Sequence, residues 1–208
     1  MNNFEVIVAG VGGQGSVLAS HIIADAAIKD GKRARVGETF GAAQRGGAVS
    51  SHVRIGDVYA PTCVSKSANA ILALELLEGA RASAKYLANN GIAVLSSECI
   101  MPVDVSIGLA KYPSLSSVVE QISKIGKVLV VDARTLAEKA GSQKCANVVM
   151  LGALYGTGML PISKKSLLES ISERVPKKTI ETNINGFSLG EEYVKKINNT
   201  NNAKANDT

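Results

Sequence analysis

The sequence has no tryptophan, and only three phenylalanines and five tyrosines among its 208 residues. Large aromatic side chains therefore cannot dominate a core, which has to be built from valine, isoleucine, leucine and alanine. Hydrophobic residues make up 46% of the chain and charged residues 20%, which is ordinary for a water-soluble globular protein. This composition is typical of a parallel sheet covered by helices. The length allows one well-buried core, and we expect a single domain over residues 1–197.

Clustered cysteines are also lacking. Cys63, Cys99 and Cys145 stand far apart, and no C-x-x-C pair occurs. An odd, scattered set predicts neither a disulfide framework nor a zinc or iron–sulfur site. We expect all three cysteines to be reduced and buried, and no metal site on this chain.

Three further classes of protein are disfavoured. No run of 18 apolar residues and no signal-peptide pattern occurs, so we expect a cytoplasmic protein without a membrane segment. The formal charge of +5 is spread along the chain without an aromatic-rich basic stripe, which argues against nucleic-acid binding. A basic face could still meet an acidic protein partner.

The common catalytic motifs are missing as well. There is no G-x-S-x-G, H-E-x-x-H or phosphate-loop sequence, and only two histidines are present. Ser50, Ser51 and His52 are consecutive on a predicted strand, where neighbouring side chains point to opposite faces, so they cannot form a triad by themselves. We expect His21 to be a packed or surface residue of a helix. The residues alone indicate a binding or partner module without its own catalytic centre.

The stretch around which the chain is organised is FEVIVAGVGGQG, residues 4–15. A short β-branched apolar run predicts a buried strand, and a helix is predicted over 15–29. Glycines between them permit a tight turn whose outward N–H groups suit an anion or a closely packed backbone. The candidate binding residues of this corner are Gly10, Gly12, Gly13, Gln14 and Gly15.

The same six residues match G-x-G-x-x-G, the dinucleotide fingerprint. Its usual companion is an acidic residue about 20 positions later. Glu38 stands near that distance, at the end of a strand predicted over 32–38 and before a predicted loop over 39–47. Two readings stay open on this motif: NAD binding with Glu38 on the ribose, or a tight corner without a ligand.

A second stretch, QRGGAVSSHVR, covers residues 44–54. Its alternating pattern predicts a strand over 48–54, with Gly46 and Gly47 as the hinge. Arg45 and Arg54 flank this strand, where a guanidinium can bind a carboxylate or phosphate with two hydrogen bonds. The alternative is that both arginines tie a loop to nearby carbonyls or to a subunit interface.

The remaining pattern predicts an α/β fold: a Rossmann-like, three-layer α/β/α arrangement with a mostly parallel, mixed sheet. A turn at 55–58 into a short extended piece ending near 61 would make two early strands a hairpin. Segment 101–112 is predicted to be irregular, 148–160 to be buried, and 198–208 to be a disordered polar tail. Other strands are predicted at 70–74, 92–95 and 127–131, and other helices at 75–90, 114–123, 133–140, 163–174 and 188–197. The helix over 133–140 is predicted to be capped by Asp132 and to stop at Gly141.

In combination, GVGGQG, ETFGAAQRGGAVSSHVRIG and KCANVVMLGAL resemble the gamma-type domain of the 2-oxoacid:ferredoxin oxidoreductases. The G-x-G-G-Q-G, G-x-x-x-R-G-G and N-x-x-x-L-G motifs occur in the family's order, and the resemblance extends from about residue 4 to 195. Gln44 before R-G-G is similar to the indolepyruvate oxidoreductase beta subunits. Asn69 departs from the aspartate expected there. The third motif adds Asn147, Leu151 and Gly152.

The resemblance implies a complex that oxidatively decarboxylates an arylpyruvate to acyl-CoA and passes the electrons to ferredoxin. It also implies that a separate alpha subunit holds the thiamine diphosphate, Mg²⁺ and [4Fe-4S] sites, and that this chain alone binds no cofactor. The corner, Gly46, Gly47 and Asn147 would then contact the partner chain or substrate, with Arg45 and Arg54 as candidate contacts. A stand-alone NAD-binding protein and a non-catalytic scaffolding module remain as alternatives.

Overall fold

The computed structural model describes residues 3–41 and 47–206. Its centre is a six-stranded sheet in the order β2-β3-β1-β4-β5-β6. Strand β3 is antiparallel to β1 and β2, and the pairs β1–β4, β4–β5 and β5–β6 are parallel. The strands are β1 (Phe4–Val11), β2 (Ala34–Phe40), β3 (Ala48–Ile55), β4 (Ala68–Ala73), β5 (Leu87–Ser96) and β6 (Lys127–Val131).

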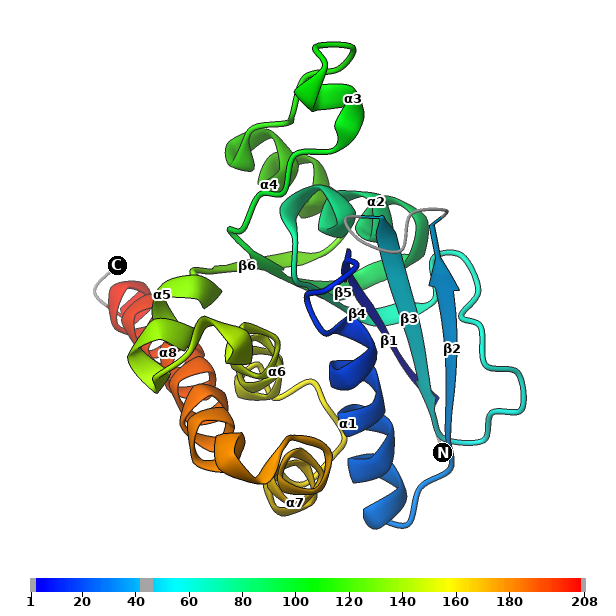
Figure 1. Cartoon of the computed structure of the whole chain (residues 1–208), viewed down its shortest axis with the longest axis vertical. Helices are drawn as coiled ribbons and strands as arrows, with labels where there is room; N and C mark the ends of the chain where they lie inside the picture. Colours follow the sequence, from blue (N-terminus) through cyan, green and yellow to red (C-terminus); the bar gives the residue numbers. More distant parts are fainter. Residues whose placement is uncertain (1–2, 42–46, 207–208) are drawn as a thin grey trace.

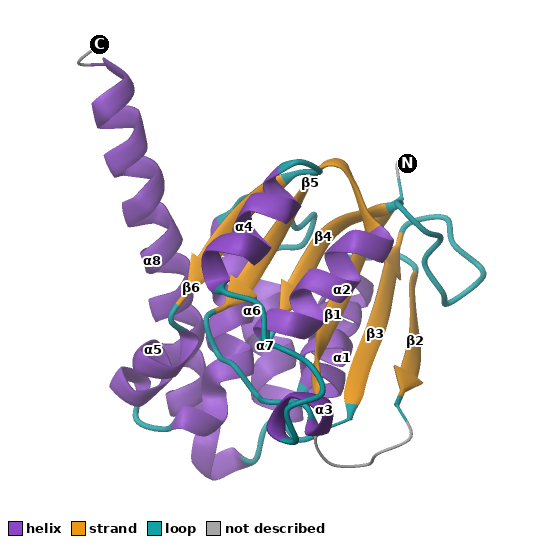
Figure 2. Cartoon of the chain, turned by 90° about the horizontal axis from the view of Figure 1, so that it is seen from above, coloured by secondary structure: helices purple, strands orange, loops and turns teal. Residues whose placement is uncertain are grey.

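Helices cover both faces of this sheet (Figures 1 and 2), which confirms the predicted α/β class. Side chains alternate along the strands and so form two cores. Val6 and Val8 pack with α1 and α6, whereas Ile7 and Ala9 pack with α2 and α4. The helices are α1 (Ser16–Lys29), α2 (Leu76–Tyr86), α3 (Val103–Ser106), α4 (Leu115–Ser123), α5 (Ala133–Ala140), α6 (Ala146–Gly156), α7 (Lys164–Arg174) and α8 (Ile180–Asn206), with 3₁₀ turns η1 (Gln143–Cys145) and η2 (Lys177–Thr179).

The sheet is mixed, as predicted, but a different hairpin makes it so. The predicted hairpin across 55–58 is absent, since 56–67 form an irregular connection. Instead β2 and β3 pair antiparallel along Ala34–Phe40. The reason is that β3 inserts between β2 and β1, pairing with both, and the connection after Ile55 then crosses to β4.

Several predicted element ends are wrong. The helix predicted over 75–90 stops at Tyr86, because Leu87 begins β5, pairs with Ala68 and is fully buried. The helix predicted over 188–197 is α8, which begins at Ile180 and extends to Asn206. It thus takes in most of the segment predicted to be disordered, since each residue added to an existing helix gains a hydrogen bond.

Adjacent parallel strands β1 and β4 are followed by helices on opposite faces, α1 on one and α2 on the other. In open α/β sheets, the carboxyl ends of such strands border a crevice that commonly binds ligands. The glycine corner follows β1 at this point. From the fold we therefore expect a ligand site at the edge formed by the ends of β1, β4, β5 and β6.

Two expectations about composition can be compared with the structure. Cys63 and Cys145 are buried and free, as expected, but Cys99 is exposed because it lies in the connection after β5. Burial raises the pKa of Cys63 to about 12. No helix in the described ranges combines the length and hydropathy needed to cross a membrane.

Candidate functional site

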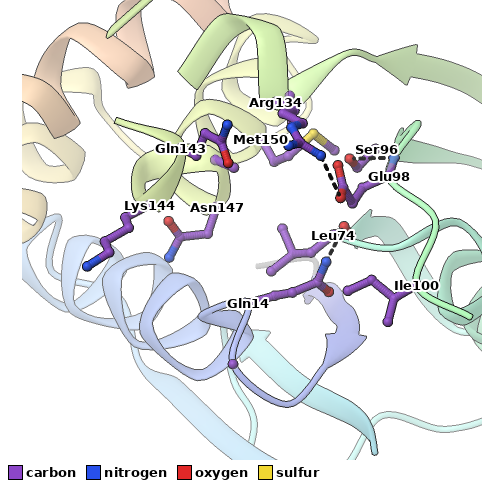
Figure 3. Close-up of a pocket in the computed structure, with 13 residues that line it drawn as sticks. Gln14, Leu74, Ser96, Glu98, Ile100, Arg134, Gln143, Lys144, Asn147 and Met150 are labelled. Carbon is purple, nitrogen blue, oxygen red and sulfur yellow. Dashed lines mark hydrogen bonds and ion pairs between the residues drawn. The ribbon is translucent and has the colours of Figure 1, made fainter. Parts of the chain in front are cut away.

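A cavity of about 260 Å³ lies at the carboxyl edge of the sheet, beside the ends of β1, β4, β5 and β6 (Figure 3). Part of its wall is apolar, with Leu74, Ile100 and Met150, and part is polar. The cavity is lined by Gly13, Gln14, Leu74, Ser96, Glu98, Ile100, Ala133, Arg134, Gln143, Lys144, Ala146, Asn147 and Met150.

Gln14 closes the crevice between β1 and β4. Its Oε1 accepts a hydrogen bond from the Val11 N–H at 2.9 Å, and its Nε2 donates to the Leu74 carbonyl at 2.9 Å. Backbone groups at the ends of both strands are thereby paired by one side-chain amide. The glutamine of G-x-G-G-Q-G thus has a structural task within its own chain.

Two glycines of the corner make room for amide side chains. A Cβ on Gly10 would lie 2.7 Å from Gln14 Oε1, and one on Gly15 would lie 2.5 Å from Asn147 Nδ2. Asn147 is buried and donates from Nδ2 to the Gly15 carbonyl at 3.2 Å, joining the starts of α1 and α6. Gly15 also has a φ of 83°, which favours glycine. Close contacts within the chain therefore account for Gly10 and Gly15.

The other corner glycines lie at the surface or join β3. Gly12 donates its N–H to the Gly47 carbonyl at 2.9 Å, which ties the corner to the start of β3. Gly13 is exposed, with a φ of 104°. Arg45 and Gly46 lie outside the described residues. Of the predicted corner residues, Gly13 is the one most open to a ligand or partner.

Glu38 is not brought to the corner. It lies on β2, separated from β1 by β3, and pairs in register with Ser51. Its carboxylate is 3.1 Å from His21 Nε2 on α1. A second groove, of about 930 Å³, runs past His21 along the first turns of α1. Because β3 lies next to β1, Glu38 on β2 is held away from the glycine corner. The sequence spacing that suggested a contact between Glu38 and a ribose is therefore not matched by the structure.

Arg54 lies at the opposite end of β3 from the corner. Its guanidinium contacts Glu5 Oε1 at 2.7 Å, and its Nη1 donates to the Ala60 carbonyl at 2.9 Å. The Glu5 side chain is almost fully buried and also accepts a hydrogen bond from Ser67. The structure therefore does not bring Arg54 together with the glycine corner, and it places the arginine in an internal ion pair.

The buried carboxylate of Glu75 was not predicted as a site residue. It caps α2 by accepting from the Glu78 N–H at 2.8 Å, and it accepts from the Ile100 N–H at 3.2 Å and from the Tyr112 hydroxyl. Burial and the hydrogen bond to Glu75 raise the pKa of Tyr112. An acidic residue directly between an apolar strand and a helix is the signal that could have indicated this cap.

Asp132 was predicted as a helix cap, and this is confirmed. It accepts from the Thr135 N–H at 3.1 Å, and hydrogen bonding by Thr135 lowers its pKa. Arg134 and Lys144 also line the cavity. They were not predicted as site residues, because nothing in the sequence relates them to the glycine corner. No group of three or more His, Cys, Asp or Glu side chains within the described ranges is placed to hold a metal ion.

The role of Gln14 can be tested by Gln14→Glu, which keeps the shape and the acceptor but removes the donor to Leu74. We expect a loss of about 1–3 kcal/mol in the free energy of unfolding of the isolated chain, because a backbone carbonyl is left without its partner beside a carboxylate. Denaturant unfolding measures this change. The matched control is Gln121→Glu on the exposed face of α4; equal stability of the two variants would contradict the assignment.

Comparisons with known proteins agree with this architecture. The sequence model for pyruvate ferredoxin/flavodoxin oxidoreductase matches residues 5–193. The chain is 40% identical to indolepyruvate oxidoreductase subunit IorB of Archaeoglobus fulgidus over 89% of this chain and 92% of the relative. Identity to the Pyrococcus horikoshii subunit of the same name is 39%, over 96% and 100%.

The fold is shared with a solved structure of the keto/oxoacid ferredoxin oxidoreductase gamma subunit from Geobacter sulfurreducens. The TM-score is 0.68 at 29% identity, covering 92% of this chain and 98% of the other. The family match spans nearly all of the described sheet and helices, and the relatives align over most of their own length. The chain therefore belongs to the pyruvate ferredoxin/flavodoxin oxidoreductase family.

Proposed function

We propose that this chain is the subunit of a cytoplasmic 2-oxoacid:ferredoxin oxidoreductase that works on indolepyruvate or a related arylpyruvate. The complex would oxidatively decarboxylate the 2-oxoacid to its acyl-CoA and pass electrons to ferredoxin. Thiamine diphosphate, Mg²⁺ and [4Fe-4S] sites would belong to a partner alpha subunit. Relatives named as indolepyruvate oxidoreductase subunits support the substrate class, and the described residues offer no metal-ligand cluster of their own.

The observation that carries this proposal is an exposed apolar segment beside the cavity. Residues 97–114, here called the arm, connect β5 to α4, and Figure 1 shows the part with α3 extending beyond the rest of the molecule. Four of its large side chains are more than half exposed: Met101, Val103, Ile107 and Leu109, at 54–77%. Such a patch is costly in water and marks an interaction surface.

The arm is held in place at both of its ends. Glu75 accepts hydrogen bonds from Ile100 near the start and from Tyr112 near the end. Between these points residues 101–111 carry two charged residues, Asp104 and Lys111. A tethered apolar arm of this kind suits a fixed protein surface. Because Glu98 and Ile100 at its base also line the cavity, a partner docked on the arm would border the cavity as well.

We expect the double substitution Ile107→Asp, Leu109→Asp to prevent assembly, since two charges would be buried at the interface. The tagged chain is purified anaerobically from its native cells, and the bound iron, thiamine and arylpyruvate- and CoA-dependent viologen reduction are measured. Co-purifying activity should fall at least about tenfold. Val64→Asp is the matched control, because Val64 is 65% exposed but lies outside the arm.

Two results would count against the proposal. One is an unchanged yield of active complex with the double variant. The other is natural chain that purifies alone and gains thermal stability when NAD is added, which would favour the stand-alone NAD-binding alternative. A complex that assembles through the arm but has no activity with arylpyruvates would keep the subunit assignment and overturn the substrate class.

A further inference from the structure

Strand β6 forms one edge of the sheet, and among the described residues only β5 pairs with it. The Ser97 N–H donates to the Val131 carbonyl at 3.0 Å, so the backbone groups of Val131 face β5. These groups alternate in direction along a strand. Those of Leu129 therefore also face β5, whereas the N–H and carbonyl groups of Val128 and Val130 face outward.

A contact with α8 confirms this outward direction. The Tyr193 hydroxyl donates to the Val130 carbonyl at 3.3 Å, and this oxygen can accept a second hydrogen bond. The N–H groups of Val128 and Val130 and the Val128 carbonyl have no hydrogen-bond partner among the described residues. The edge thus offers two donors and two acceptors to another strand.

The side chains of β6 do not protect this edge. The run Val128–Val131 is apolar and mostly β-branched, and its first three side chains are half-buried. The strand has one charged residue, Lys127, at its start. The opposite edge of the sheet, β2, carries Arg35 and Glu38 within the strand. Charges of this kind oppose edge-to-edge pairing, and an apolar edge without them favours it.

A second copy of β6 matches this edge. In antiparallel pairing with a two-fold axis at Leu129, Val128 of one copy lies opposite Val130 of the other. Outward-facing residues in that position exchange both of their hydrogen bonds. The same pairing places the two Leu129 side chains side by side and Lys127 opposite Val131, so apolar groups meet and like charges do not.

We infer that two copies of this chain pair through β6, antiparallel and centred on Leu129, so that one sheet runs through both. Figure 2 shows the C-terminal half of α8 extending past β6, where it flanks the second copy. This half of α8 carries a hollow of about 360 Å³, lined by Tyr193, Lys196, Ile197 and Thr200. The surface does not include the arm, so the inference goes beyond the proposed function and does not depend on it.

The experiment is gel filtration with light scattering on the isolated chain, from about 10 to 200 µM. We expect a dimer. Val128→Pro removes an outward N–H but no bond to β5, a position where an edge strand tolerates proline, and it should weaken the dimer at least about tenfold. Val36→Pro is the matched control on β2, where the Gly41 N–H donates to the Ala48 carbonyl and Val36 therefore faces outward. Thermal unfolding checks that both variants fold.

A cross-link tests the register. Leu129→Cys is made together with Cys99→Ser, because Cys99 is exposed. At the two-fold axis the Cα atoms of residue 129 would be about 4.5 Å apart, which is within the range of a disulfide. We expect mild oxidation to join the two chains. Val130→Cys in the same background should cross-link at least about tenfold less, since Val130 lies opposite Val128 and not opposite itself.

Three results would overturn the inference. One is a natural chain that stays monomeric over the whole concentration range, and another is a dimer that persists in folded Val128→Pro. The third is a dimer that is lost in Ile107→Asp with Leu109→Asp but kept in Val128→Pro, which would place the contact on the arm. Equal cross-linking by Leu129→Cys and Val130→Cys would refute the register. Assembly with the partner subunit is measured separately, so either proposal can fail without the other.

Discussion

Gly152→Ala is expected to destabilise the protein by about 3 kcal/mol or more. Gly152 lies in α6 where α8 crosses it, and an added Cβ would overlap the Phe187 carbonyl oxygen and Cα. Gly190 on α8 meets the backbone of Val149 in α6 in the same way. Since the obstacle is backbone on both sides, rotation of a side chain cannot relieve it, and the two helices have to separate.

Denaturant unfolding of the isolated chain measures this effect. Gly31→Ala is the comparison, because Gly31 has a φ of 74° but open space around its Cβ position. That variant reports the conformational cost of alanine alone, about 1–2 kcal/mol. If Gly152→Ala proved no more destabilising than Gly31→Ala, the close approach of α6 and α8 would not hold the fold together.

Local signals were sufficient for the elements that depend on neighbouring residues. The apolar run before the glycine corner gave β1, the helical spacing after it gave α1, and Asp132 with Gly141 correctly bounded α5. The apolar character all round residues 148–160 correctly indicated burial over 148–154, which lies in α6, but Gly158 and Met159 near the end of the segment are exposed. In each case the determining residues lie within one or two turns of the element.

Long-range pairing could not be predicted in this way. Gln14 hydrogen-bonds to Leu74, 60 residues away, and Arg54 pairs with Glu5, 49 residues away. The insertion of β3 between β2 and β1 is a choice of strand order, which the alternating pattern of β3 does not encode. Segment 101–112 of the arm was predicted to be irregular, but it contains the short helix α3. Its apolar side chains gave no sign in the sequence that they face solvent.

The glycine motifs also show the difference between what local sequence indicates and what long-range contacts determine. Glycine spacing alone suggested a dinucleotide site. The sequence shows only that a Cβ is missing, and not whether a ligand or another part of the chain fills the space. In the structure Gly10 accommodates Gln14, Gly15 accommodates Asn147 and Gly152 accommodates α8. Glycines in two of the motifs that resemble the family therefore serve contacts within the chain, and the region left for a ligand is the cavity beyond them.

The second large effect is expected for Arg54→Met, which would leave the buried Glu5 carboxylate without its cation. Breaking such a pair costs about 3–5 kcal/mol, whereas replacing both partners by apolar residues of similar size is often nearly neutral. We therefore expect Arg54→Met to be strongly destabilising and Glu5→Leu with Arg54→Met to recover most of the loss. Arg33→Met, at the exposed pair with Asp57, should have little effect.

Stability and turnover together separate a structural role for Arg54 from a direct contact with substrate or partner. If Arg54 serves only the ion pair, the double variant assembled into the complex should keep kcat/KM within about twofold of the natural protein. A contact with substrate would instead lower kcat/KM in the single and double variants alike, however well the double variant folds. Because Arg54 lies at the opposite end of β3 from the glycine corner and is paired with Glu5, we expect stability to change and turnover to be preserved.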